Sequence, residues 1–171
     1  YSLPGMFNFN IYGIPYVGAD ICGFFTDTNE ELCARWMELG AFYPFARNHN
    51  TLGAVNQEPY LWESVAESSR VAINIRYALL PLYYTLSYQA HEEGLTIIRP
   101  LFFEYPHDTS LYDFDIQFLI GANVMISPVL HPGHTSVNVL FPQGIWYDYY
   151  DYTITSDNDS QEKVIVDAPI N

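Results

Sequence analysis

The chain has 171 residues, of which 49% are hydrophobic and 17% aromatic, so it has the composition of a folded protein with a core. Its formal net charge is −14, from 20 acidic and six basic residues. A nucleic-acid backbone and an anionic membrane surface both attract basic proteins, so this charge argues against either partner. No apolar run reaches the roughly 18 residues that a membrane-spanning helix needs. Tyr1 is no initiator residue, and we expect the chain to be a fragment.

The first predicted elements are a helix over residues 1–12 and a buried strand over residues 13–20. Thr28 and Glu31 have the spacing of a capping box, which predicts that a helix begins there. An apolar stripe at helical spacing follows, and Gly40 marks the end of this helix. An irregular aromatic and polar connection comes next.

A second, longer helix is predicted to begin at a capping box formed by Ser64 and Glu67. Pro81 removes one backbone hydrogen bond and should kink it, and Gly94 ends it. Residues 96–103 then have the pattern of another buried strand. Alternating strands and helices predict an α/β fold with parallel strands, and the polar loops favour a (β/α) barrel.

The pattern changes after residue 121, where short strand-like runs alternate with turn signals. The expected strands cover residues 124–130, 136–141, 145–148 and 163–166. The expected turns cover residues 132–133, 142–144 and 156–158. Such spacing is typical of an all-β domain. We therefore expect a barrel part over residues 1–121 and the beginning of a β-sandwich over residues 122–171.

Cys22 and Cys33 are compatible with one disulfide or with two buried free thiols. A disulfide would indicate a secreted, lysosomal or vacuolar protein, because those compartments are oxidising. Asn158 begins an Asn-Asp-Ser glycosylation triplet, which agrees with that route but is common by chance.

Asp20 follows an apolar segment, and acids at the carboxyl ends of buried strands often contact ligands. It is equally compatible with a helix cap or a loop brace. Arg47 and His49 offer donors for sugar hydroxyls or a carboxylate, although a loop histidine is more often structural. Phe24 and nearby aromatic residues are suited to walling a ring or to packing in a core. The other histidines lack metal-ligand spacing, and no phosphate loop is visible, so we expect neither a metal nor a cofactor.

Several successive motifs resemble glycoside hydrolase family 31. They cover residues 18–24, 30–36, 40–45, 47–50, 57–60, 76–81, 99–102 and 127–130. The chain is most similar to the acid α-glucosidase and maltase-glucoamylase branch, with a fungal-like character. The resemblance implies the C-terminal portion of a (β/α)8 TIM barrel, followed by the beginning of an all-β sandwich domain.

The resemblance also implies a retaining exo-acting α-glucosidase that hydrolyses terminal non-reducing α-glucosyl residues of maltose, malto-oligosaccharides or starch. The family's nucleophile and acid/base motifs are absent from this sequence and are expected upstream of Tyr1, so the fragment alone should be inactive. An α-xylosidase and a non-catalytic sugar-binding homologue are the alternatives.

Residue by residue, the resemblance gives His49 the role of a hydrogen-bonding partner of the non-reducing glucose. Asp20 matches an acid that lines the same pocket but is neither nucleophile nor acid/base. Phe24 matches an aromatic wall, and Arg47 is expected to brace His49 or Asp20. Cys22 and Cys33 match a disulfide of the family.

Overall fold

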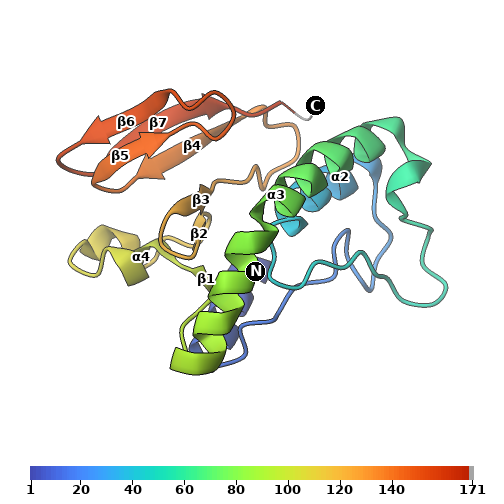
Figure 1. Ribbon diagram of the computed structural model, residues 1–171. Helices are drawn as coiled ribbons and strands as arrows, with labels where there is room; N and C mark the ends of the chain where they lie inside the picture. The colour runs from blue at the N-terminus through green and yellow to red at the C-terminus, as the bar shows by residue number, and fades with distance from the viewer. Residues whose placement is uncertain (170–171) are drawn as a thin grey trace.

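Residues 1–169 are described by the computed structural model, in which α2 and α3 lie at one side and the strands β4 to β7 at the other, with α4 on the side of the strands (Figure 1). The helices are α1 (Ser2–Ile11), α2 (Glu30–Gly40), α3 (Glu63–Glu93) and α4 (Leu101–Glu104), with 3-10 turns at Pro59–Leu61 and Thr109–Leu111. The strands are β1 (Ile98–Arg99), β2 (Phe118–Ile120), β3 (Val124–Ile126), β4 (Ser136–Phe141), β5 (Gly144–Tyr147), β6 (Ile154–Asn158) and β7 (Glu162–Asp167). No helix of this described part is long and apolar enough to cross a membrane.

Helix α2 begins one residue later than the predicted capping box. Its N-cap is Asn29, whose extended backbone lets Oδ1 accept a hydrogen bond from the Leu32 amide at 3.0 Å. The expected box of Thr28 and Glu31 is therefore wrong. Glu31 instead accepts from Arg35, one helical turn later, at 3.2 Å. The helix ends at Gly40, as predicted.

Helix α3 lacks the predicted capping box as well. It begins at Glu63 with no side-chain cap, and the Ser64 hydroxyl donates to Glu30 of α2 at 2.5 Å. The helix continues through Pro81, and Figure 1 shows that its axis bends along its length. Gly94 ends it in the left-handed conformation, with φ of 72°, which glycine adopts without a steric penalty.

The strand predicted over residues 13–20 is not formed. Val17 accepts a hydrogen bond from the Phe45 amide at 3.1 Å, and Ile21 pairs with Asn48 in a single parallel bridge. A longer ladder does not develop between these two segments. The two extended segments nevertheless lie side by side, which brings the loops that follow them together.

The strand predicted over residues 96–103 is shorter than expected. Only β1 pairs, and Pro100 then forms the N-cap of α4. Strands β1, β2 and β3 form an antiparallel sheet in that order, so the expectation of parallel strands fails for this sheet. Strand β2 had no counterpart in the prediction.

The C-terminal strands form two antiparallel pairs, β4 with β7 and β5 with β6. Strand β6 contains residues 156–158, which were expected to form a turn. Ser156 is 3% exposed and pairs with Trp146. These residues form a strand although their polar sequence is typical of a turn. Residue 121 lies between β2 and β3 of one sheet, and the division of the chain at that point stays a prediction.

A polar contact joins the helical and β parts of the chain. The Glu31 carboxylate accepts a hydrogen bond from the Gly133 amide at 2.6 Å, and Arg35 donates to the His134 carbonyl. Arg35 is 7% exposed, so its charge lies largely out of water beside the carboxylate of Glu31. These bonds hold α2 against the turn that precedes β4.

Candidate functional site

The loops that follow the two extended segments carry the predicted site residues. Asp20 and Arg47 form an ion pair, with Arg47 Nη2 donating to Asp20 Oδ1 at 2.7 Å. The guanidinium also lies over the ring of Phe45, 5.4 Å from its centroid. Of the two partners expected for Arg47, the structure therefore pairs it with Asp20. The pair is partly exposed, so its oxygen and nitrogen atoms are accessible to a ligand.

Phe24 and His49 form a second pair beside the first. Their ring centroids are 5.3 Å apart and their planes are inclined by 32°. Phe24 is half-buried, whereas His49 is exposed. This arrangement offers an aromatic face together with imidazole nitrogen atoms that can donate or accept a hydrogen bond.

A tight turn at Cys22 and Gly23 separates Asp20 from Phe24. Both residues have positive φ, 73° and 97°, which is costly for a residue with a side chain. A disulfide joins Cys22 to Cys33 on α2, which confirms the predicted pairing, and their Cα atoms are 4.6 Å apart. The turn is thus covalently attached to a helix.

The loop that carries Arg47 and His49 is held by helix α3. Arg76 donates hydrogen bonds to the carbonyl oxygens of Ala41 and Tyr43, both at 2.6 Å, and to that of Pro44 at 3.0 Å. Three carbonyls on one guanidinium fix the backbone just before the loop. This anchor has no local signal in the sequence, because Arg76 and its three acceptors lie more than thirty residues apart.

Gln57 is a second residue that holds the site loops and whose role has no signal in the sequence. Its side chain is 4% exposed and bonds to both site loops. Its motif was noted, but a single sequence gives no sign that a glutamine in a polar loop is buried.

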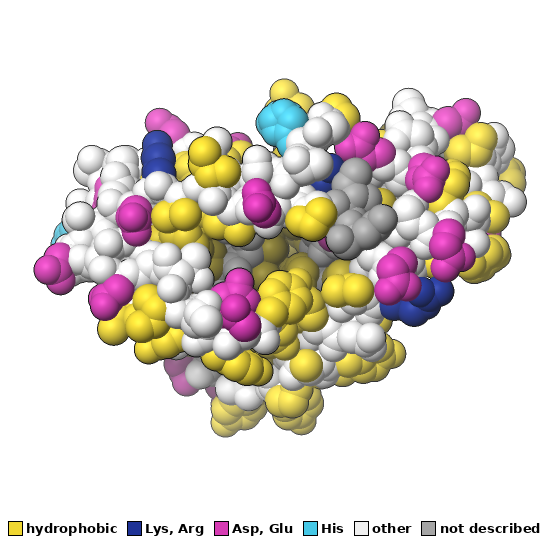
Figure 2. Space-filling view, turned by 90° about the horizontal axis from the view of Figure 1, so that it is seen from above, with side chains coloured by type: hydrophobic (Ala, Val, Ile, Leu, Met, Phe, Trp, Pro, Cys, Tyr) yellow, Lys and Arg dark blue, Asp and Glu magenta, His cyan; other side chains and the backbone are white. Residues whose placement is uncertain are grey.

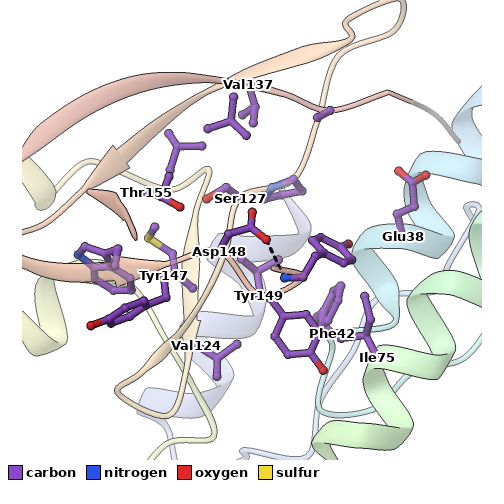
Figure 3. A pocket seen from close by; sticks show the side chains of 18 of the residues that line it. Glu38, Phe42, Ile75, Val124, Ser127, Val137, Tyr147, Asp148, Tyr149 and Thr155 are labelled. Carbon is purple, nitrogen blue, oxygen red and sulfur yellow. Dashed lines mark hydrogen bonds between the residues drawn. The ribbon is translucent and has the colours of Figure 1, made fainter. Parts of the chain in front are cut away.

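A cavity of about 1110 Å³ lies between the helices and the β strands, apart from the loops of the candidate site. Figure 3 shows Phe42 and Ile75 on its helical side and Tyr147 and Tyr149 on its β side. In Figure 2 the molecule is hollowed between hydrophobic side chains, with acidic groups scattered around the opening. Within the described residues 1–169, none of the four predicted site residues lines this cavity.

Glu38 of α2 lines this cavity, and burial raises the pKa of its carboxyl from 4.5 to about 7, although Arg35 opposes the shift. The folded state therefore keeps a proton that the unfolded state loses between about pH 4.5 and 7. Stability should fall as the pH rises through this window.

We predict that Glu38→Gln stabilises the protein above pH 7 and changes nothing below pH 4.5. The gain should be about 1 kcal/mol, less than the full shift implies, because part of the carboxyl stays in solvent. Thermal unfolding at pH 4 and pH 8 measures it, with the exposed Glu63→Gln as control. An equal effect of Glu38→Gln at both pH values would contradict the assignment.

The described residues include no group of three or more histidine, cysteine, aspartate or glutamate side chains placed to hold a metal ion. The candidate site on the two loops offers a carboxylate, a guanidinium, an imidazole and an aromatic ring. These groups are suited to a small hydroxylated ligand, because hydroxyls both donate and accept while an aromatic face covers the ligand ring. Fold and site together define a segment of an α/β protein whose loops carry a polar and aromatic candidate site.

Known protein families agree with that class. Residues 1–86 match the glycosyl hydrolases family 31 TIM-barrel domain, and residues 94–171 match the glycosyl hydrolase family 31 C-terminal domain. The chain therefore belongs to glycosyl hydrolase family 31. The predicted family and the predicted fold class, a C-terminal barrel part followed by a β domain, are both confirmed.

Individual relatives cover nearly the whole chain. It is 54% identical to an alpha-glucosidase of Mucor javanicus, over 99% of this chain and 20% of that protein. It is 49% identical to alpha-xylosidase 1 of Arabidopsis thaliana, over 99% of this chain and 19% of that protein. A crystal structure of a glucosidase II alpha subunit bound to alpha3-Glc2 has a TM-score of 0.93 and 37% identity, over 99% of this chain and 19% of that one. The chain spans about a fifth of the length of these relatives.

Proposed function

We propose that the chain supplies part of the glucose-binding subsite of a retaining exo-acting α-glucosidase. The enzyme would hydrolyse terminal non-reducing α-glucosyl residues of maltose, malto-oligosaccharides or starch. The observation that carries the proposal is the meeting of the Asp20–Arg47 ion pair and the Phe24–His49 ring pair on neighbouring loops. The alpha-glucosidase relatives support it.

Each residue has a separate role in this proposal. The Asp20 carboxylate accepts hydrogen bonds from sugar hydroxyls, and the hydrogen bond from Arg47 keeps this carboxylate oriented. The Phe24 ring covers one face of the sugar, and His49 hydrogen-bonds a hydroxyl of the non-reducing glucose. Retaining glycosidases also need a nucleophile and an acid/base carboxyl. We place both in the part of the enzyme that precedes Tyr1.

An α-xylosidase is the second candidate, since alpha-xylosidase 1 of Arabidopsis thaliana is 49% identical. Xylose lacks the hydroxymethyl group of glucose, so a glucose subsite and a xylose subsite differ in the walls near that group. A non-catalytic sugar-binding homologue is the third candidate. The two catalytic carboxylates distinguish it from the enzymes.

Activity of the full-length enzyme on maltose and on an aryl α-xyloside tests the proposal. We expect kcat/KM for maltose to exceed that for the xyloside by about 100-fold or more, because binding sites discriminate strongly when a hydrogen-bonded hydroxyl is missing. The glucose released from the non-reducing end should appear first by NMR as the α-anomer. The reverse preference would support the α-xylosidase. Binding of glucose without hydrolysis of either substrate would support the non-catalytic homologue.

We also propose a secreted, lysosomal or vacuolar location, because the disulfide between Cys22 and Cys33 is stable in oxidising compartments. Asn158 is the candidate glycan site at the end of β6, and its amide now donates to Ser156 and Glu162, both at 2.5 Å. A glycan would take the place of one of the two amide hydrogens and so remove one of these bonds. Enzymatic deglycosylation should lower the mass of the enzyme, and Asn158→Gln should reduce that change. An unmodified Asn158 would remove this support.

A further inference from the structure

We propose that Gln57 is a positioning residue, which fixes the turn before Phe24 and joins it to the loop that carries His49. This inference rests on the proposed function, because the positioned residues are those of the glucose subsite. Gln57 itself is 4% exposed and lies beneath the two loops, where it has no route to a ligand.

The amide group of Gln57 bonds to the backbone on both sides of Cys22. Its Nε2 donates to the Ile21 carbonyl at 3.1 Å and to the Gly23 carbonyl at 3.2 Å. These two carbonyls converge because Cys22 and Gly23 both have positive φ. A donor at this point therefore stabilises a backbone shape that a residue such as Cys22 rarely adopts.

The same amide reaches the second loop through Asn48. Gln57 Nε2 shares its two hydrogens among the Ile21 and Gly23 carbonyls and Asn48 Oδ1, which lies at 3.0 Å. Asn48 Nδ2 donates back to the backbone carbonyl of Gln57 at 2.9 Å. Asn48 lies between Arg47 and His49 and forms the bridge to Ile21. One buried side chain thus fixes both loops, and with them the distance between the rings of Phe24 and His49.

The disulfide does not make Gln57 redundant. It attaches Cys22 to α2, whereas Gln57 fixes the turn to the loop of Asn48. Gln57 Oε1 has no hydrogen-bond partner among residues 1–169, so the side chain acts here through its amide hydrogens alone. Replacing that amide with a carboxylate of the same size should therefore place an oxygen against three acceptors.

Gln57→Glu in the full-length enzyme tests the proposal. We expect kcat/KM for maltose to fall by about 10- to 100-fold, because small displacements of binding groups have effects of this size. Affinity for glucose, measured by calorimetry, should fall as well. Gln57→Asn keeps the amide on a side chain one methylene shorter and should lie between the wild type and Gln57→Glu. It is also the variant to use if the glutamate variant does not fold.

Gln117→Glu is the matched control. Gln117 is fully buried and bonds to the amide and carbonyl of Leu140 in the β part, at 2.8 and 3.2 Å. This variant should lower the melting temperature and leave kcat/KM for maltose unchanged. Equal losses of activity in the two glutamate variants would show a general loss of stability and would overturn the positioning role.

Two further measurements separate this inference from the proposed function. If Gln57 acts through the loop of His49, then Gln57→Glu should add little to the loss of kcat/KM caused by His49→Ala. Full additivity of the two losses would contradict the coupling.

Hydrogen exchange at the amides of Ile21, Gly23 and Thr51 should become faster in Gln57→Glu, and unchanged exchange would overturn the positioning role. If amide exchange is faster in Gln57→Glu but the wild-type enzyme does not hydrolyse maltose, the proposed function is contradicted and the positioning role of Gln57 is supported.

Discussion

His49→Ala is expected to lower kcat/KM for maltose by about 100- to 1,000-fold in the full-length enzyme, the usual loss when one hydrogen-bonding group at the reacting centre is removed. His49 is exposed at its loop and packs against Phe24 with a centroid distance of 5.3 Å. Few contacts in the core depend on it, so the melting temperature should change little. Steady-state kinetics and thermal unfolding of the same preparation measure both effects.

His91→Ala is the control for this prediction. His91 lies in the last turn of α3, and its side chain is 83% exposed. Its replacement should alter neither kinetics nor stability. If His49→Ala kept the kcat/KM of the wild type, His49 would have no part in the glucose subsite. A large drop in melting temperature would instead assign it a structural role.

The three longer helices, α1, α2 and α3, were predictable because their signals are local, whereas α4 lies in a segment that was predicted as a strand. Gly40 and Gly94 mark the ends of α2 and α3 in the sequence and in the structure. The beginnings were predicted less well. Asn29 caps α2 although Thr28 also has a capping side chain, and Ser64 contacts Glu30 of another helix instead of its own backbone. Which polar residue caps a helix depends on neighbours that are distant in the sequence.

The strands were less predictable, because a strand exists only through its partner. Residues 13–20 have a suitable apolar pattern, but only Ile21 forms a bridge. Conversely, residues 156–158 were predicted to form a turn, yet they belong to β6, which pairs with β5. Apolar patterning shows which residues can be buried, whereas the partner is set by packing elsewhere.

The residues of the candidate site came from motifs, and their grouping came from the structure. Asp20 and Arg47 are 27 positions apart, so their ion pair is invisible in the sequence. Gln57 was part of a motif without a role, and its burial and its bonds to both loops are what assign one.

Loss of the disulfide should have the largest effect on stability. Replacing Cys22 and Cys33 together with alanine opens a loop with a sequence separation of 11 residues, which should lower the free energy of unfolding by about 2–3 kcal/mol. Activity should fall as well, because the turn before Phe24 then loses its covalent attachment to α2. Thermal inactivation and maltose kinetics under oxidising conditions measure both effects.

The backbone conformation at position 22 must be separated from the loss of the covalent bond. Cys22 has φ of 73°, where alanine is strained and glycine is not. Cys22→Gly with Cys33→Ala should therefore be more stable than the double alanine variant but less stable than the wild type. The difference from the wild type then reports the disulfide, and the difference between the two variants reports the strained turn. Equal stability of all three proteins would mean that the disulfide does not stabilise this part of the enzyme.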